Sequence, residues 1–245
     1  MSKLDYIPRM NRMRSFEIVQ NILTVLVMIL FGIVFGLAII PSYFLFEKLR
    51  SLSDGHGEFI EAAGICVGIG LGYILWGVCL LVICGLFGGI FRIRKEEGRY
   101  PLRSVITIQW AFSLVAHRVA RVFLGLIVPS FIGTIYYRMM GAKIGKGVQL
   151  NSMNINDASM ISIGDGVVVG GDATINGHLV ENGEIVLAPV RICDRALIGG
   201  GSIIQPGCII GSGAVIASRA VVPKWTEVPE GEVWGGIPAK FIKKV

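Results

Sequence analysis

The hydrophobic pattern in the last part of the chain has a period of six residues. An aliphatic side chain recurs at Ile192, Ile198, Ile204, Ile210, Ile216, Val222 and Val228. The position four residues further on is small in each case: Ala196, Ser202, Cys208, Ala214, Ala220 and Thr226. A helix needs apolar residues three or four apart, and a half-buried strand needs alternation, so neither explains this period. A fixed six-residue repeat is typical of a parallel β-helix, whose coils stack and bury one interior ladder.

The same step occurs earlier in the chain, with two interruptions. Ile144 and Leu150 begin the first coils, and the pattern becomes irregular at residues 151–159. The step then resumes and breaks again at residues 176–191. We therefore predict a β-helix over residues 141–245 with a loop excursion at 176–191.

The excursion carries candidate chemistry. Asn182 and Gly183 lie between two short apolar runs, a pattern that predicts a hairpin turn. His178 is the only histidine in this half of the chain. A loop that leaves a rigid solenoid is a common place for function. Asn176 and Glu181 flank His178 and are candidates for contacts with an acceptor substrate.

The first half of the chain is apolar enough for a membrane. Uncharged runs extend over residues 18–46 and 62–91. The whole chain is 53% hydrophobic and 16% charged, with a mean hydropathy of +0.68. A span needs about 20 apolar residues, so each run is long enough to cross a bilayer. We predict a basic arm at residues 1–15 and a two-helix membrane domain at 16–103, whose helices are joined by a loop at 47–61.

The basic residues predict the orientation of these helices. Four precede the first run: Lys3, Arg9, Arg12 and Arg14. Five follow the second run: Arg92, Arg94, Lys95, Arg99 and Arg103. Cytoplasmic loops carry the excess of Lys and Arg, so both termini and the β-helix should face the cytoplasm of a multi-pass cell-membrane protein. The segment at residues 92–101 forms a basic connector suited to anionic lipid headgroups.

Residues 104–140 form a third apolar segment with a polar stripe. Gln109, Ser113, His117 and Arg121 recur at every fourth position, which places them on one face of a helix. We predict an amphipathic helix in the membrane interface, kinked or ended by Pro129. A short third span at residues 122–137 is the alternative, and it would carry the β-helix to the outside.

The remaining composition narrows the classes of function. The net charge of +6 is explained by topology and lipid headgroups, and the chain has no DNA-binding motif, so we expect no nucleic-acid partner. The five cysteines form no CxxC pair. That spacing predicts neither structural disulfides nor a zinc site.

Three motifs resemble those of a known family. They are Ile198-Gly-Gly-Gly-Ser, Ile210-Gly-Ser-Gly-Ala and the closing Trp234-Gly-Gly-Ile-Pro-Ala-Lys240. In these the chain resembles the left-handed β-helix hexapeptide-repeat acyltransferases. The order of parts is similar to the terminal hexapeptide modules of membrane-bound poly-lysine synthetases. The resemblance implies a homotrimer and an acyl thioester co-substrate, acetyl-CoA or a carrier-bound group, with no permanently bound cofactor.

The resemblance also implies roles for particular residues. A histidine leaving a coil in such a loop is the family's general base, and His178 occupies that place. The donor-binding candidates lie in or near the closing motif: Ser218, Arg219, Lys224, Pro238 and Lys240. No residue is assigned to a metal. A carbonic anhydrase on this fold needs three histidines around zinc, and the repeat domain offers only His178.

Two functions remain from this reasoning. The first is a membrane-anchored acyltransferase, of the O- or N-acetyltransferase kind, that modifies a hydroxyl or amine of a membrane-associated acceptor such as a lipid-linked molecule. The alternative is a non-catalytic trimeric scaffold that holds a partner, such as a synthetase, at the membrane. A His178 side chain that points away from any groove would favour the scaffold.

Overall fold

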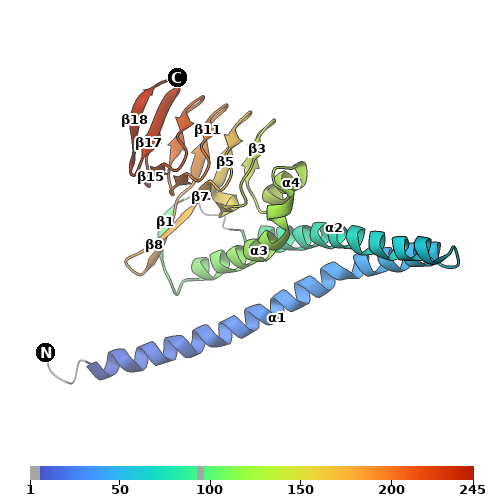
Figure 1. The fold of residues 1–245 in the computed structure, drawn as a ribbon. Helices are drawn as coiled ribbons and strands as arrows, with labels where there is room; N and C mark the ends of the chain where they lie inside the picture. The colour runs from blue at the N-terminus through green and yellow to red at the C-terminus, as the bar shows by residue number, and fades with distance from the viewer. Residues whose placement is uncertain (1–5, 93–96) are drawn as a thin grey trace. The chain divides into compact units, whose positions relative to one another are not determined.

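The computed structural model describes residues 6–92 and 97–245, with side chains from residue 21 onward except that of Leu23. The chain divides into two compact units, Met1–Cys79 and Leu80–Val245. Each unit is described by itself below, and Figure 1 labels the elements of both.

The first unit is a helical hairpin. It consists of α1 (Tyr6–Ser53) and most of α2 (Glu58–Ile90), so the connecting loop is shorter than the predicted 47–61. A Cβ atom at Gly64 would collide with the side chain of Ser53, and one at Gly68 would press on Phe46. Small residues therefore permit the two backbones to approach closely.

Three helices in the described part of the chain are long and apolar enough to cross a membrane. They are Thr24–Ser53, Glu58–Ile90 and Val105–Ile127. The first two agree with the predicted spans. The third is the segment for which we predict an interfacial helix.

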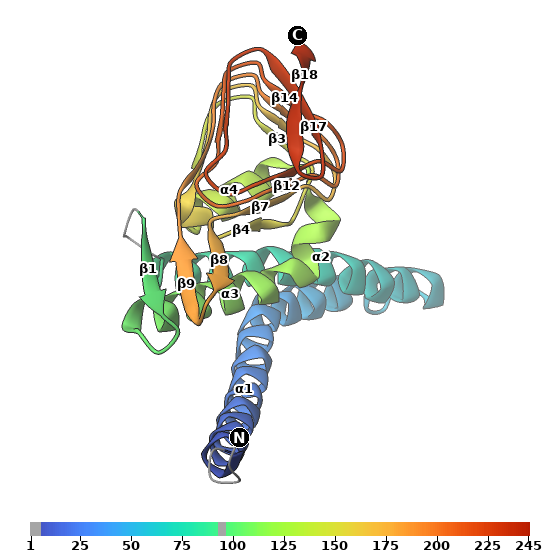
Figure 2. The same ribbon diagram turned by 90° about the vertical axis from the view of Figure 1, so that its left-hand side faces the viewer.

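The second unit is built on a parallel β-helix with three sheets. One sheet contains β2 (Lys143–Ile144), β5 (Ile161–Ile163), β10 (Val190–Ile192), β13 (Ile209–Ile210) and β16 (Glu227–Val228). The second contains β3 (Gln149–Leu150), β6 (Val168–Val169), β11 (Leu197–Ile198), β14 (Val215–Ile216), β17 (Glu232–Gly236) and the antiparallel β18 (Ala239–Lys244). The third contains β4 (Ile155–Asn156), β7 (Thr174–Asn176), β12 (Ile203–Ile204) and β15 (Val221–Val222). Viewed along its axis, the coils stack in a roughly triangular outline (Figure 2).

The register of these sheets explains the six-residue period. Ile192 pairs with Ile210, and Ile198 pairs with Ile216, so three hexapeptides complete one coil. These four side chains are at most 1% exposed. Cys208 occupies one of the small inward positions and is fully buried, and burial raises the pKa of its thiol to about 11. The predicted interior ladder is confirmed.

Two helices cover the first coil. They are α3 (Val105–Ile127), capped by Ser104, and α4 (Phe131–Met139), capped by Ser130. The predicted single helix over residues 104–140 is therefore two helices, because Pro129 lies between them and cannot continue α3.

The middle of the polar stripe of α3 faces the protein. His117 is buried, with Nδ1 3.0 Å from the hydroxyl of Tyr136 and Nε2 3.2 Å from the backbone carbonyl oxygen of Met153. Ser113 is buried as well, whereas Gln109 is exposed. Apolar side chains such as Val105 and Leu126 are also exposed on α3. The buried part of the stripe thus packs against α4 and the first coil, and the interfacial position of the helix stays a prediction.

The excursion folds into a small antiparallel sheet. The strands β8 (His178–Glu181) and β9 (Glu184–Leu187) form a hairpin. Asn182 and Gly183 have φ angles of 51° and 78°, so the predicted turn is confirmed. A third strand, β1 (Gly98–Pro101), pairs with β9 and was not predicted. Part of the predicted basic connector is therefore a strand (Figure 1).

The interior ladder should dominate the stability of the β-helix. Truncating Ile210 to alanine should lower the free energy of unfolding by about 2–5 kcal/mol, because the stacked coils cannot collapse into the space left. The matched control is Ile209→Ala, since Ile209 lies on the same strand with 36% of its surface exposed. Unfolding in detergent, followed by circular dichroism, should show a much smaller effect for Ile209→Ala, and an equal effect would contradict the assignment.

Candidate active site

The site centres on His178, the first residue of β8. The side chain of His178 is 20% exposed, and its Nδ1 lies 2.5 Å from Oδ2 of Asp157. The side chain of Asp157 is 3% exposed, so the carboxylate is almost buried. A buried carboxylate needs hydrogen-bond donors, and His178 supplies one of them.

Asp157 reaches this position through the irregularity of the first coil. Ile144 pairs with Ile163, nineteen residues away, whereas Ile192 pairs with Ile210, eighteen residues away. Ile155 pairs with Ile175, twenty residues away, so the chain is one residue short between Leu150 and Ile155 and two residues long between Ile155 and Ile163. Asp157 lies in this longer part, with left-handed backbone angles (φ 59°, ψ 51°), just before the 3₁₀ turn Ala158–Met160. Aspartate tolerates this conformation better than most residues. The insertion therefore places a carboxylate beside the start of the excursion.

Two further donors complete the coordination of Asp157. The backbone N–H of Gly177 donates to Oδ2 at 3.1 Å, and the indole Nε1 of Trp110 donates to Oδ1 at 2.9 Å. The Trp110 ring also lies against the imidazole of His178, with ring centroids 4.8 Å apart and an interplanar angle of 60°. Each carboxylate oxygen therefore has at least one donor.

The hydrogen bond to Asp157 fixes the tautomer of neutral His178. An ionised carboxylate only accepts hydrogen bonds, so the proton lies on Nδ1 and Nε2 carries a lone pair. Within residues 6–92 and 97–245, no hydrogen bond engages Nε2. A neutral imidazole held in this way can remove a proton from a hydroxyl or amine. The same residues contain no group of three or more His, Cys, Asp or Glu side chains arranged to hold a metal ion.

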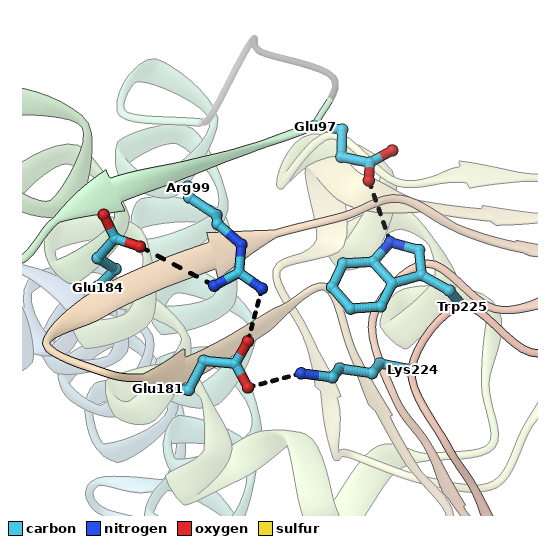
Figure 3. Close-up of polar contacts among 6 residues, drawn as sticks. All are labelled: Glu97, Arg99, Glu181, Glu184, Lys224 and Trp225. Atoms are coloured by element: carbon cyan, nitrogen blue, oxygen red, sulfur yellow. Dashed lines mark hydrogen bonds and ion pairs between the residues drawn. The ribbon is translucent and has the colours of Figure 1, made fainter.

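Two predicted site residues, Glu181 and Lys224, contact each other (Figure 3). Nζ of Lys224 lies 2.6 Å from one carboxylate oxygen of Glu181, and Nη2 of Arg99 lies 2.8 Å from the other. The hydrogen bond from Lys224, together with the contact from Arg99, holds the pKa of Glu181 below its ordinary value. Ion pairs thus connect the hairpin of β8 and β9 to β1 and to the turn after β15.

A second contact joins the same segments. Nε1 of Trp225 donates to Glu97 at 3.0 Å, and Nζ of Lys224 lies 5.1 Å from the centre of the Trp225 ring. Figure 3 shows the hydrogen bond between Trp225 and Glu97 beside the Glu181 network. We call Glu97, Arg99, Glu181, Glu184, Lys224 and Trp225 the latch.

The other predicted donor-binding residues lie apart from the latch. Ser218 and Arg219 form an exposed turn between β14 and β15. Pro238 and Lys240 are exposed at the closing hairpin of β17 and β18. All four are exposed and so accessible to a ligand, and neither pair contacts His178.

Asn176 lies on β7, where its side-chain carbonyl accepts a hydrogen bond of 2.8 Å from Asn156. It therefore belongs to a polar ladder between two coils, two residues before His178.

Sequence reasoning missed two residues of this site, Asp157 and Trp110. The irregular stretch at 151–159 was the only signal for Asp157. Nothing in the spacing of α3 marked Trp110, which lies one position after the polar stripe begins at Gln109. Both belong to the site through contacts between residues far apart in the chain.

Comparisons with known proteins agree with the repeat. The model of the bacterial transferase hexapeptide (six repeats) matches residues 189–224. Delta-poly-L-ornithine synthetase of Acinetobacter baumannii (strain AB307-0294) is 29% identical over 145 residues, which are 59% of this chain and 11% of that protein. The chain thus spans about a tenth of the length of that relative.

Solved structures with a similar fold include two acetyltransferases. A hexapeptide-repeat acetyltransferase from Vibrio cholerae has a TM-score of 0.42 and 22% identity, over 54% of this chain and 92% of that one. A maltose O-acetyltransferase from Clostridium difficile has a TM-score of 0.44 and 20% identity, over 61% of this chain and 93% of that one. The Vibrio cholerae protein is also known in complex with acetyl coenzyme A, with a TM-score of 0.39 and 21% identity, over 53% and 87% of the two chains. The repeat that organises residues 189–224 is a hexapeptide repeat of the bacterial transferase type.

Proposed function

We propose that this protein is a membrane-anchored acyltransferase that uses His178 as its general base. The observation that carries the proposal is the Asp157–His178 pair, in which Nδ1 is bonded to a buried carboxylate and Nε2 is left to act on a substrate. The hexapeptide transferase repeat at residues 189–224 supports the same reaction class.

The acyl group passes directly from the thioester to the acceptor. Nε2 of His178 removes the proton of the acceptor O–H or N–H as the acceptor atom attacks the carbonyl carbon of the thioester. When the C–S bond breaks, the thiolate takes the proton back from Nε2. Asp157 stays ionised throughout and stabilises the imidazolium formed between the two transfers. The products are an ester or amide and a free thiol, and the enzyme is unchanged.

The donor is an acyl thioester, either acetyl-CoA or a group carried on a protein. Ser218, Arg219, Lys224, Pro238 and Lys240 remain the proposed donor-binding residues. The three cations among them suit the phosphates of a pantetheine-bearing donor. The similarity in order of parts to the poly-lysine synthetase modules favours a carrier-bound donor, and acetyl-CoA is the alternative.

The acceptor is proposed to be associated with the membrane. Helices α1 and α2 are long and apolar enough to span it, and α3 exposes several apolar side chains. The counts of Lys and Arg favour a cytoplasmic position for both termini and the β-helix of a cell-membrane protein. We also propose a homotrimer, in which the acceptor-facing residues Asn176 and Glu181 approach a neighbouring β-helix.

A thioester-cleavage assay tests the reaction class. The detergent-purified full chain is supplied with acetyl-CoA, or with an acylated carrier, and with a membrane-lipid and glycolipid extract. Thiol release that depends on the extract should fall about 10²-fold or more in His178→Ala, because the acceptor proton loses its base. The matched control is His56→Ala, since His56 lies in the exposed turn between α1 and α2 and should leave the rate unchanged.

Extract-dependent release that is equal in wild type and His178→Ala would overturn the catalytic role of His178. Negligible release with both donors in wild type would instead favour the trimeric scaffold.

Asp157 provides a second, independent test. Replacement by asparagine keeps the size and the tolerance for left-handed backbone angles, but places an N–H₂ or an uncharged carbonyl against Nδ1. The imidazolium then loses its counter-charge and the tautomer is no longer fixed. We expect kcat to fall about 10²-fold with little change in KM, as measured by steady-state kinetics. A variant that raises KM alone would show that Asp157 serves binding instead.

Variants of two latch residues distinguish two possible roles for Lys224. If Lys224 binds the donor, Lys224→Gln should raise the KM for the donor about fivefold, whereas Glu181→Gln should not raise it, because that variant frees the cation. If the ion pair only holds the hairpin, both variants should reduce activity equally. Donor titrations of the two variants distinguish these outcomes, and equal losses would remove Lys224 from the donor site.

A further inference from the structure

We propose that Trp110 is a positioning residue, through which α3 holds the Asp157–His178 pair in its productive arrangement. The inference rests on the proposed function, because it assigns the residue that orients the base. It adds a part of the site that lies outside the β-helix and its excursion.

The two oxygens of Asp157 have different partners. Oδ2 receives the hydrogen bonds from Nδ1 of His178 and from the backbone of Gly177. Oδ1 receives the indole N–H of Trp110 at 2.9 Å. Trp110 therefore determines the rotation of the carboxylate about its Cβ–Cγ bond, and this rotation aims Oδ2 at His178.

The ring of Trp110 acts on His178 directly as well. It lies against the imidazole at a centroid distance of 4.8 Å, tilted by 60°. A tilted aromatic pair at this distance is favourable and restricts rotation of the smaller ring. The imidazole is thus limited on one side by indole and at Nδ1 by carboxylate.

Trp110 is itself held by packing. It lies with Tyr100 and Ile106 against a buried cluster of Met160, Ile185 and Leu187. These residues come from α3, β1, the 3₁₀ turn after Asp157 and the strand β9. The indole is therefore fixed by the same hairpin whose first residue is His178.

Because Trp110 lies on α3, its contact with Asp157 connects this helix to the candidate site. The other side of this helix exposes apolar side chains, including Val105, Ile108 and Phe112, which suit a lipid environment. Trp110 lies on the same helix, and its indole N–H donates the hydrogen bond to Asp157, the partner of His178. An ordered His178 therefore requires that α3 packs in the observed position.

The test separates the indole N–H from the bulk of the ring. Trp110→Phe keeps an aromatic ring against His178 and the apolar cluster but leaves the nearly buried Oδ1 without its donor. The full chain is purified in detergent with ¹⁵N-labelled histidine. Only three histidines are present, so the signals of His178 can be assigned by comparison with His178→Ala.

When its ring is neutral, wild-type His178 should show the ¹⁵N shifts of the tautomer protonated at Nδ1. In Trp110→Phe we expect a mixture of the two tautomers. We also expect kcat to be about tenfold lower with KM within twofold of wild type.

Two controls identify how Trp110 acts. Tyr136→Phe removes the buried hydrogen bond to His117 beneath the same helix, without touching Asp157 or His178. It should leave the tautomer of His178 unchanged, even if it destabilises the packing of α3. In the Asp157→Asn background, Trp110→Phe should cause no further loss of kcat, because Trp110 acts through the carboxylate.

An unchanged tautomer and kcat in Trp110→Phe would overturn the inference while leaving His178 as the base. Equal changes in Trp110→Phe and Tyr136→Phe would assign Trp110 a packing role only, which also overturns it. The tautomer is read without substrate, so a protein with no thioester activity would refute the proposed function and still answer the question about Trp110.

Discussion

The interior ladder of the β-helix is the interaction on which the rest of the structure depends. Each coil buries one aliphatic side chain per sheet against the same position of the next coil, as Ile192 does against Ile210. Stacking of this kind fixes the spacing of the coils and leaves little freedom for sliding, because a shifted register would expose the ladder. A site built from neighbouring coils therefore inherits a rigid frame.

The candidate site forms where the chain departs from this frame. Two extra residues between Ile155 and Ile163 in the first coil position Asp157, and a longer excursion after the second coil begins at His178. The two departures lie 21 residues apart in the sequence, yet the carboxylate and the imidazole are hydrogen-bonded. The helix that covers the first coil adds Trp110 to the same carboxylate. The regular coils form the rigid frame, and the residues of the candidate site lie where the repeat is interrupted or covered by α3.

The sequence predicted those features that depend on local pattern. The six-residue period predicted the ladder, and Asn182–Gly183 predicted the hairpin turn. It could not predict the bond between Trp110 and Asp157, whose residues are 47 positions apart. It did not predict what covers the polar stripe of α3, because a periodic pattern identifies a face of a helix but not its neighbours. Ser113 and His117 of the stripe are buried against protein, whereas Gln109 is exposed.

The role of His178 as the base can be tested by a structure of the detergent-purified protein with an acylated phosphopantetheine amide. This arm is shared by coenzyme A and carrier proteins, and the amide cannot transfer its acyl group. We expect the acyl carbonyl to lie beside Nε2 of His178, with room between them for one acceptor hydroxyl or amine at about 3 Å from each. An arm bound away from His178, or a protein that binds no arm, would contradict the proposed role of His178.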